Sequence, residues 1–496
     1  MQFDLKTLDG TGRQARPKQL EALAWLSANW AKVPVLALQL PTGVGKSFLA
    51  RVIQRATKGR IVVPSNLLMG QYIATYPEVN FLKGRTHYAC HEGLGSCDDR
   101  KSLGMKPCPG CPYREARRAA AEAIPTIFNP MSMFYLDRDP NTVPPTVLIV
   151  DEAHSLVDML KTLASKRFPV DKWGKPDSLD QVDIEAWLER QTMVVKHLMA
   201  KAAKTDIKAF IRHRSELDSI ELVLESYRAA PEHYVITREQ DKYRGKDSES
   251  TYLRPIFPPP VLVRQMLGAH KIILMSATLL ETDVKLLAAG REYLRLDSPS
   301  PIDKARRPLV YAPLGQRVNY RTPPEALATH ALALLARHPG ENAIIHATYE
   351  LAAKLAPLLS ARIPGLITHT AETKESQLDV FKAKGGVFLA SGCSEGVDLP
   401  GDLCRVNIIL SLQRGNPSSP EVRLRLALPG GREEYELTAL KTVIQQTGRS
   451  TRGETDKSVT YICDPQFPEY YLKQKPRLPI SFCEAIVWKL PTKAGK

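Results

Sequence analysis

Residues 33–47, VPVLALQLPTGVGKS, decide the fold of this chain. The apolar run at residues 33–38 is typical of a strand that is buried on both faces of a sheet. A glycine-rich turn follows, and the residues from Ser47 to about Thr57 predict a helix. A strand, a loop and a helix in this order predict the start of a nucleotide-binding α/β unit.

The turn in this stretch has the composition of a phosphate-binding loop. Its glycines let backbone N–H groups converge on phosphate oxygens at the start of a helix. We expect Lys46 to neutralise the outer phosphates and the Ser47 hydroxyl to bind Mg²⁺. The longer form of the motif has a glycine where Leu40 stands, but the shorter form after a buried strand is still specific. The predicted ATP-binding residues of the loop are Pro41, Thr42, Gly43, Val44, Gly45, Lys46 and Ser47.

Three further strands are predicted at residues 60–64, 146–150 and 271–275. The last of these ends at Ser276-Ala277-Thr278. Open α/β sheets bind their ligands at the carboxyl ends of parallel strands, so polar residues that follow these strands are candidates for a site.

Asp151 and Glu152 directly follow the strand at 146–150. A carboxylate in the first position can hold Mg²⁺, and one in the second can orient and deprotonate the attacking water. An Asp-Glu pair alone is commonplace and is more often structural. Its position at the end of a strand, some way after Lys46, favours the catalytic interpretation.

Cys90, Cys97, Cys108 and Cys111 lie between these two motifs with the spacing C-x6-C-x10-C-x2-C, in a stretch rich in glycine, proline and basic residues. Four thiolates suit either zinc or an iron-sulfur cluster, and the spacing alone does not separate the two. His87 and His91 lie nearby, but a lone histidine is more often structural than a ligand. The other four cysteines are scattered and are interpreted as small apolar residues.

A second insertion, from about Ser155 to Ser250, is mostly helical and polar in pattern. Its basic residues could line a nucleic-acid path, although a charged run on a helix is usually a solvated face. These residues are Lys196, Lys201, Lys204, Lys208, Arg212 and Arg214.

After Leu296 a second α/β unit is predicted, with strands at residues 342–346, 386–390 and 406–410. Near its end, Arg449 and Arg452 are three residues apart and would share one helical face. They are candidate arginine fingers, which stabilise the charge of a transferring phosphoryl group. The alternative is an exposed basic helix.

The composition bounds the class of protein. A chain of 496 residues exceeds one hydrophobic core, and a formal charge of +15 with a pI near 9.3 favours a polyanionic partner. A basic surface that only contacts solvent remains the alternative. The first residues lack the order of a signal peptide and the apolar runs are too short to cross a bilayer, so we expect a cytoplasmic protein. We also expect a monomer.

Together these motifs resemble the DinG/XPD branch of superfamily 2 helicases, in the same order over nearly the whole chain. Residues 16–19 resemble the adenine-reading element, with Gln19 as the recognising residue, and residues 64–71 resemble motif Ia. Residues 82–90 and 111–117 are similar to the segments that carry the first and last cluster cysteines, and Asn129 falls at a matching position.

The resemblance assigns further site residues. Ser276-Ala277-Thr278 resembles motif III, and residues 394–401 resemble motif V, which brings Glu395, Gly396 and Asp398 to the ATP site. Residues 445–452 resemble motif VI, whose Gln445, Arg449 and Arg452 are implied to face the γ-phosphate. In this branch the four cysteines hold a 4Fe-4S cluster, which becomes the preferred assignment, with zinc as the alternative.

The resemblance also implies the domains. Two RecA-like parallel-sheet domains are expected, with an iron-sulfur module and a mostly helical arch inserted in the first. The expected boundaries are 1–82, 119–154 and 253–296 for helicase domain 1, 83–118 for the cluster module, 155–252 for the arch, and 297–496 for helicase domain 2.

The expected function is an ATP- and Mg²⁺-dependent DNA helicase of the DNA repair and replication type, which translocates 5′ to 3′ on single-stranded DNA and unwinds forked duplex or DNA-RNA hybrid. The cluster module would act as a wedge or gate. The first alternative is an RNA helicase, which the Asp-Glu-Ala-His string at 151–154 suggests. The second is a nucleic-acid-stimulated ATPase that acts as an assembly switch and opens no duplex.

Overall fold

The structure is a computed structural model, and it describes residues 14–93, 95–122, 125–138, 142–203, 205–243, 245–315, 322–392, 399, 401–448, 450–451, 453 and 455–489. The chain forms two compact units. The first comprises residues 1–38, 46–295 and 418–425, and the second comprises residues 39–45, 296–417 and 426–496.

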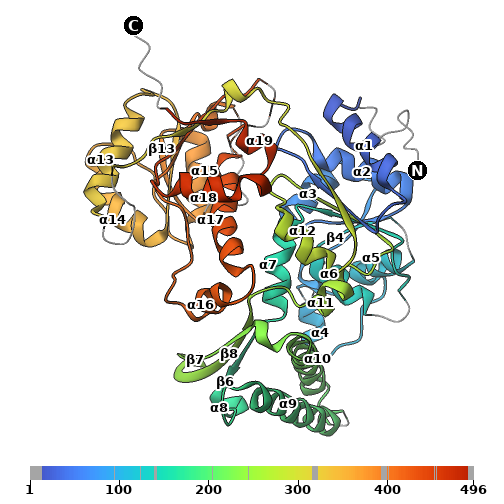
Figure 1. The fold of residues 1–496 in the computed structure, drawn as a ribbon. Coiled ribbons are helices and arrows are strands. Elements are labelled where there is room, and N and C mark those ends of the chain that lie inside the picture. The colour runs from blue at the N-terminus through green and yellow to red at the C-terminus, as the bar shows by residue number, and fades with distance from the viewer. Residues whose placement is uncertain are drawn as a thin grey trace. The chain divides into compact units, whose positions relative to one another are not determined.

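The first unit is built on a seven-stranded sheet, of which β4 is labelled in Figure 1. The order of its strands is β10-β1-β9-β5-β2-β4-β3. The neighbouring pairs from β9 to β3 are parallel. The predicted strands are confirmed to within two residues at each end. The strands are β1 (Val35–Gln39), β2 (Arg60–Val62), β3 (Asn80–Leu82), β4 (Thr126–Phe128), β5 (Val147–Asp151), β9 (Lys271–Ser276) and β10 (Tyr293–Asp297).

Helices cover this sheet because its central strands are apolar on both faces. All five residues of β1 and of β5 are buried. One face packs against apolar residues of α6, α7, α11 and α12, including Met133, Leu156, Leu262 and Leu287. The helices of this part are α1 (Pro17–Asn29), α2 (Lys46–Thr57), α3 (Asn66–Thr75), α6 (Pro130–Asp137), α7 (His154–Leu163), α11 (Pro260–Met266) and α12 (Glu281–Ala288).

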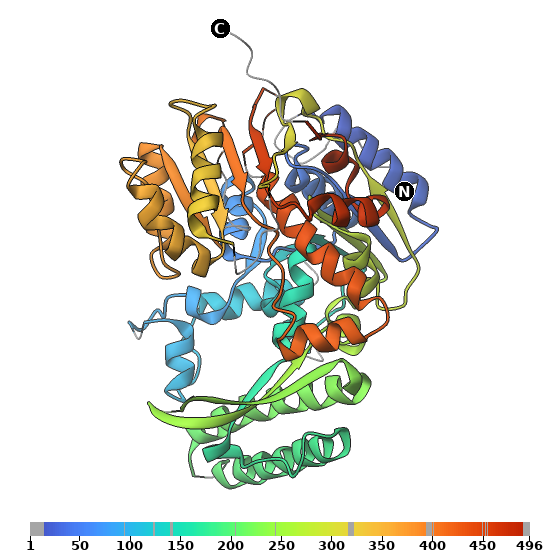
Figure 2. The ribbon, with the colours of Figure 1, turned by 60° about the vertical axis from the view of Figure 1, so that its left-hand side comes forward.

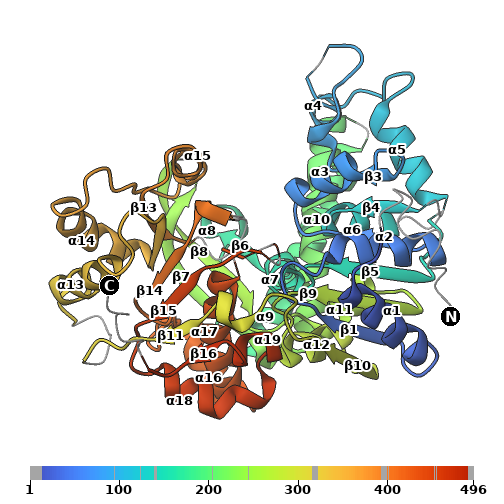
Figure 3. The ribbon, with the colours of Figure 1, turned by 90° about the horizontal axis from the view of Figure 1, so that it is seen from above.

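The cysteine module follows β3 and contains little regular structure, as its composition predicts. It contains the 3₁₀ turn η1 (Arg85–His87) and the helices α4 (Cys97–Ser102) and α5 (Pro112–Ala121). An isolated antiparallel bridge pairs Ala89 with Ser96. The helix α5 packs beside β3, so the module lies at the β3 edge of the sheet (Figure 3).

The second insertion contains two long helices, α9 (Gln181–Ala202) and α10 (Ile207–Ala229), which lie side by side (green in Figure 2). It also contains a three-stranded antiparallel sheet that the sequence did not lead us to expect. The sheet has the order β6-β8-β7. Its strands are β6 (Lys166–Pro169), β7 (Tyr234–Tyr243) and β8 (Lys246–Pro255), and the short helix α8 (Val170–Trp173) and the turn η2 (Pro231–His233) complete the insertion.

This insertion has a hydrophobic core of its own, in which Phe168, Trp187 and Tyr227 are buried together. The preceding helix α7 packs instead with the core of the seven-stranded sheet, through Leu156 and Leu160. The chain therefore passes from one core to the other between α7 and β6, and α10 contacts both cores, because its Leu222 packs in the core of the seven-stranded sheet.

The second unit is built on a six-stranded parallel sheet with the order β13-β12-β14-β15-β11-β16. Its strands are β11 (Leu309–Tyr311), β12 (Ala343–Ala347), β13 (Val387–Ser391), β14 (Val406–Ile409), β15 (Val459–Ile462) and β16 (Ile486–Val487). The three strands predicted here are confirmed. The helices that follow Leu296 are α13 (Pro324–Leu335), α14 (Tyr349–Ser360), α15 (Lys374–Lys384), α16 (Pro420–Ala427), α17 (Gly431–Thr447), α18 (Phe467–Gln474) and α19 (Ile480–Cys483), with the 3₁₀ turns η3 (Lys304–Arg306), η4 (Gly401–Leu403) and η5 (Lys475–Arg477).

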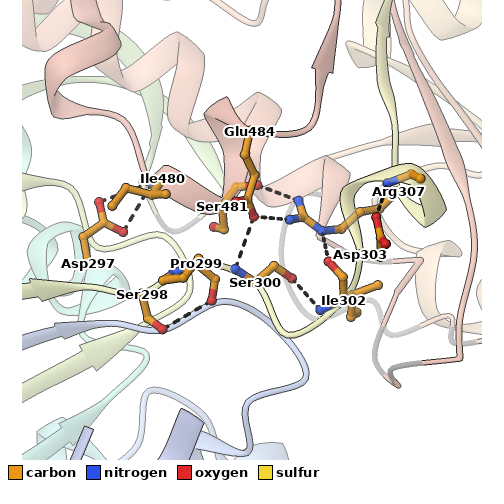
Figure 4. Close-up of polar contacts among 11 residues, drawn as sticks. Asp297, Ser298, Pro299, Ser300, Ile302, Asp303, Arg307, Ile480, Ser481 and Glu484 are labelled. Carbon is orange, nitrogen blue, oxygen red and sulfur yellow. Dashed lines mark hydrogen bonds and ion pairs between the residues drawn. The ribbon is translucent and has the colours of Figure 1, made fainter. Parts of the chain in front are cut away.

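The segment that leads into this unit is attached to α19 by polar contacts (Figure 4). Arg307 donates to the carbonyl oxygens of Ile302, at 3.0 Å, and Ser481, at 2.5 Å, and forms an ion pair with Glu484. The same carboxylate accepts from the Ser300 N–H at 3.3 Å. These contacts fix the path of the chain before β11.

Among the described residues, the structure contains no helix with the length and apolar character needed to span a bilayer.

Candidate nucleotide site and cysteine site

Three of the predicted motifs stand at the carboxyl ends of adjacent strands. β1, β9 and β5 are neighbours in the sheet, and they end at the glycine-rich loop, at Ser276 and at Asp151 respectively. Strands β5 and β9 are parallel and so end at the same edge of the sheet. Lys46, at the start of α2, contacts Glu152 at that edge, as expected for a ligand site in an α/β sheet.

The glycine-rich loop has the backbone conformation that its sequence predicts. Gly43 and Gly45 have φ values of 86° and 87°, in the left-handed region that a residue with a Cβ rarely adopts. The Val44 N–H donates to the Pro41 carbonyl at 3.5 Å, and α2 begins at Lys46. The N–H groups at the start of a helix have no partner within the helix, which makes this end suitable for phosphate.

The four residues predicted for catalysis and Mg²⁺ binding in this unit lie close together. Lys46 Nζ is 3.4 Å from Glu152 Oε1, and the Ser47 hydroxyl donates to Asp151 Oδ2 at 3.5 Å. Lys46 is buried even though it carries a charge, which indicates that its ammonium group is held for a specific anionic partner. The hydroxyl and carboxylate oxygens are hard ligands of the kind that Mg²⁺ prefers, so this donor set fits the ion.

Glu152 is held by a network that reaches β9 and α7. The Ser276 hydroxyl donates to Glu152 Oε2 at 3.0 Å and lies 2.7 Å from His154 Nδ1, and the Thr278 N–H donates to the same hydroxyl at 3.0 Å. The Ser155 hydroxyl is 3.2 Å from His154 Nε2. Both ring nitrogens of the histidine therefore have partners, which fix the ring beside the carboxylate.

The two adjacent carboxyl groups have opposite pKa shifts. Burial, together with the charge of Glu152, raises the pKa of Asp151 to about 6. Burial also acts to raise the pKa of Glu152, but the Lys46 ammonium and the contacts with His154 and Ser276 outweigh it and hold that pKa well below its usual range. Glu152 is thus ionised at neutral pH, as a group that orients and deprotonates water requires.

The Asp151 carboxylate has a partner that sequence reasoning missed. The hydroxyl of Tyr72, on α3, donates to Asp151 Oδ2 at 2.8 Å. Tyr72 is separated from Asp151 by 79 positions, and in the sequence it is indistinguishable from an ordinary core aromatic residue.

Gln19 is buried in the first turn of α1, where it also has a local role. Its side-chain oxygen accepts a hydrogen bond of 2.8 Å from the Arg16 N–H, as the N3 residue of a capping box does. Its assignment to adenine recognition stays a prediction.

In the second unit, Gln445 is buried near the end of α17. Ser450, five residues further on, belongs to a buried hydrogen-bond network. The Asn407 side chain donates to the Ser450 hydroxyl at 2.8 Å, and that hydroxyl donates to the Ser458 hydroxyl at 2.7 Å. Asn407 and Ser458 were not predicted from the sequence. The other predicted residues of this unit lie outside the described residues, namely Glu395, Gly396, Asp398, Arg449 and Arg452.

The structure brings the four predicted cysteines into one cluster. Cys90, Cys108 and Cys111 are buried together, with Cys97 packed against them. The sulfur atoms of Cys97 and Cys111 are 3.8 Å apart. The described cysteines form no disulfide bond. The residue types and their convergence fit a group that binds thiolates, whereas no three of the described His, Cys, Asp or Glu side chains are arranged to hold a single metal ion.

Polar contacts around the sulfurs favour negative charge at part of this cluster. Arg100 forms an ion pair with Glu92 at 2.5 Å, and its guanidinium is 4.0 Å from Cys90 Sγ. Burial acts to raise the pKa of Cys111, but backbone N–H groups at the start of α5 and the neighbouring thiols outweigh it and lower that pKa. Burial raises the pKa of Cys97 to about 11. A bound metal would have to displace that proton.

The basic residues predicted for a nucleic-acid path lie on α9 and α10, except for Lys204, which is outside the described residues. Lys196 is paired with Glu221 at 2.8 Å, and Arg214 with Asp218 at 3.3 Å. Because their charges are partly neutralised by these carboxylates, Lys196 and Arg214 would attract a nucleic acid less strongly than the sequence alone suggests.

Comparisons with known proteins agree with this architecture. Residues 333–477 match the family described as "Helicase C-terminal domain". Two solved structures, described as "XPD_APO" and "Structure of S. tokodaii Xpd4", each align with a TM-score of 0.56 and 16% identity, over 96% of this chain and 100% of theirs. No curated protein matches the chain. Residues 333–477 therefore match a helicase C-terminal domain, and the chain as a whole is similar in fold to the two XPD structures.

Proposed function

We propose that this protein is an ATP-dependent DNA helicase of the DinG/XPD type. The observation that carries the proposal is the meeting of Lys46, Ser47, Asp151 and Glu152 at one edge of the seven-stranded sheet, in a chain that also matches a helicase C-terminal domain. This combination supports nucleotide hydrolysis linked to movement on nucleic acid.

The first step is the binding of the nucleotide. The loop of residues 41–47 holds the phosphates through its backbone N–H groups, and Lys46 contacts the outer phosphates. Because Lys46 is paired with Glu152, the incoming phosphate competes for the ammonium group and leaves Glu152 available to water. Ser47 and Asp151 would hold Mg²⁺, which would neutralise charge on the phosphates.

The second step is hydrolysis, together with the transmission of the resulting change at Glu152 to neighbouring residues. Glu152 orients the attacking water and accepts its proton. Its hydrogen bond with Ser276 places it in contact with the segment that the resemblance assigns to strand handling, so a change at the carboxylate reaches residues 276–278. Gln445, Arg449 and Arg452 are proposed to act on the γ-phosphate, as the family resemblance implies.

The nucleic acid is proposed to contact the cysteine module and the helical insertion. These two parts are in close contact within the first unit. Gly104 follows α4 and lies beside Ile207, the first residue of α10, so closely that a Cβ on this glycine would be 2.6 Å from the Ile207 side chain. The formal charge of +15 supports a polyanionic substrate. We propose translocation from 5′ to 3′ on single-stranded DNA, with a forked or hybrid duplex as the substrate for unwinding.

The four cysteines are proposed to hold a 4Fe-4S cluster, with zinc as the alternative. Two thiolates of a tetrahedral zinc site, with Zn–S distances of about 2.3 Å, lie about 3.8 Å apart. The Cys97–Cys111 distance has this value, so the pair is compatible with the alternative, although the full set of four is not arranged around one ion. Iron and zinc analysis of protein purified without oxygen, with its absorption spectrum, decides between them.

Strand displacement tests the proposed activity. Duplexes with a 5′ DNA tail, a 3′ DNA tail or a 5′ RNA tail are incubated with ATP and Mg²⁺, with Lys46→Ala as the inactive control. Unwinding of the first substrate alone supports the proposal. Preference for the RNA tail would favour an RNA helicase, and hydrolysis without displacement on any substrate would favour an assembly switch.

A further inference from the structure

The hydroxyl of Tyr72 is a fixed part of the carboxylate environment at the nucleotide site. It donates to Asp151 Oδ2 at 2.8 Å, the shorter of the two hydrogen bonds to that oxygen, since the bond from Ser47 measures 3.5 Å. Asp151 Oδ1 accepts from the Glu152 N–H at 3.0 Å. Both the tyrosine and the aspartate are almost completely buried. Two hydrogen bonds therefore fix the rotamer of the Asp151 carboxylate, one from the Glu152 backbone and one from Tyr72 on α3.

The hydrogen bond from Tyr72 to Asp151 joins a phenol to a buried carboxylate. A charge-assisted hydrogen bond of this kind is stronger than one between neutral groups.

The opposite end of α3 is attached to the cysteine module. The side chain of Asn66, the first residue of the helix, is 2.9 Å from His87 Nε2 in the turn η1, which leads to Cys90. Asn66 Oδ1 also accepts from Asn129 at 3.2 Å, and Asn129 caps α6. One helix of ten residues therefore contacts the segment before the first cysteine at one end and the magnesium carboxylate near the other.

We propose that α3 is a positioning helix in which Tyr72 holds the Asp151 carboxylate ready for Mg²⁺, and in which the Asn66–His87 contact sets the placement of the helix. The inference rests on the proposed nucleotide site and deepens it. It assigns to two residues outside the phosphate-binding and Asp-Glu motifs a role in Mg²⁺ affinity, and it gives the cysteine module a physical connection to the site.

The expected change in Mg²⁺ affinity can be estimated from other proteins in which a side chain hydrogen-bonds to a metal ligand. Loss of a group that orients a metal-binding side chain lowers metal affinity about 10- to 100-fold. Tyr72→Phe keeps the ring and its packing and removes only the donor. We expect Tyr72→Phe to raise the half-saturating Mg²⁺ concentration about tenfold. For Asn66→Ala we expect a rise of about threefold, because the Asn66–His87 contact is exposed and acts through the helix.

The test measures binding without turnover. A mant-labelled β,γ-imido ATP analogue is titrated with Mg²⁺, and its fluorescence gives the half-saturating Mg²⁺ concentration for each variant. Binding of the same analogue in EDTA gives the contribution that does not depend on the metal. Tyr76→Phe is the matched control, because it makes the same change in a buried tyrosine one turn further along, whose ring centroid is 6.3 Å from that of Tyr72.

The inference predicts that Tyr72→Phe shifts the Mg²⁺ titration and leaves binding in EDTA unchanged, while Tyr76→Phe shifts neither. It also predicts that Asn66→Ala causes no further shift in the Tyr72→Phe background, since both residues act through one helix. A titration for Tyr72→Phe that coincides with the wild type would overturn the inference, and so would additive shifts in the double variant. Failure of the wild type to bind the analogue at all would reject the proposed function itself, and the inference with it.

Discussion

Lys46, Ser47, Asp151 and Glu152 stand at the ends of strands and helices of a seven-stranded sheet, whereas the four cysteines stand on loops and short helices at its edge. Strands β1 and β5 are buried along their whole length, so the positions of the residues that follow them are fixed by backbone pairing. In the cysteine module the apolar cluster consists of the four cysteine side chains and Tyr113. There the candidate ligands are themselves the core.

The nucleotide site and the cysteine module are therefore expected to depend on their ligands to different extents. The nucleotide site is organised by the sheet, and its side chains already meet through hydrogen bonds and an ion pair. A module whose core is its own ligand set is expected to couple metal binding to folding. Four substitutions test this contrast, ordered from the largest expected effect to the smallest.

Glu152→Gln is expected to have the largest effect, because it removes the group that accepts the proton of water. Loss of a general base lowers turnover by about 10²- to 10⁴-fold, while the neutral side chain should leave ATP bound. Phosphate release and binding of labelled ATP measure the two quantities. Glu375→Gln, at an exposed position on α15, is the control. Turnover close to that of the wild type would remove Glu152 from the assigned role.

Arg60→Met tests whether the sheet also anchors the module. Arg60 is buried at the start of β2, where it pairs with Asp137 at 2.8 Å and donates to the Ala120 carbonyl at 3.3 Å at the end of α5. Removing one partner of a buried ion pair costs about 3 kcal/mol of unfolding free energy. A thermal or urea unfolding curve measures the loss, with Arg118→Met, which is largely exposed on the same α5, as the control. Equal stability of the two variants would show that the anchor is unimportant.

Ser276→Ala is expected to have an intermediate effect on catalysis. It removes a donor to Glu152 Oε2 and the partner of His154 Nδ1, but it leaves the carboxylate in place. A hydrogen bond to a charged group contributes about 1.5 kcal/mol, which corresponds to about a tenfold fall in turnover. Steady-state hydrolysis measures it, and Ser376→Ala on the exposed surface of α15 serves as the control. If turnover fell as far as in Glu152→Gln, Ser276 would have a direct part in the chemistry.

Cys111→Ser is expected to have the smallest effect at the nucleotide site. It should abolish metal binding and make residues 84–121 sensitive to trypsin, because the core of the module is lost. The Mg²⁺ requirement for binding the nucleotide analogue should rise about threefold at most, the value expected for the loss of the Asn66–His87 contact. Metal analysis and limited proteolysis follow the first effects, and Cys483→Ser is the control. Loss of nucleotide binding in Cys111→Ser would mean that the two sites fold as one.

The predicted strands and the phosphate-binding loop were found because their signals are local. An apolar run, a glycine turn and a helix occupy consecutive residues at 33–57, and the structure places them as expected. The antiparallel sheet β6-β8-β7 was missed because residues 236–251 are mainly polar and give no alternating apolar pattern. Gly245, with φ of 80° between β7 and β8, was the one signal of a hairpin.

Tyr72, Asn407 and Ser458 could not be predicted for a different reason. Their partners are 79, 43 and 8 positions away, respectively, and each contact exists only after a sheet has formed. A tyrosine in an apolar helix and an asparagine in a buried strand carry no local mark of the side chain that they will meet. The sequence motifs thus indicate which residues take part in the chemistry, whereas the residues that hold them in position can be identified only from the packing of the fold.

The backbone of Glu152 adds a consequence for protein engineering. Its φ of 50° places a long side chain in the left-handed region, which costs roughly 1–2 kcal/mol and is relieved by glycine. Glu152→Gly relieves this strain, but it also removes the carboxylate that pairs with the buried Lys46 ammonium, which costs about 3 kcal/mol, so the variant is expected to melt at a lower temperature than the wild type and to lose hydrolysis. A library selected for thermal stability alone would therefore keep Glu152 despite its strained backbone, because its ion pair with Lys46 contributes more than the strain costs.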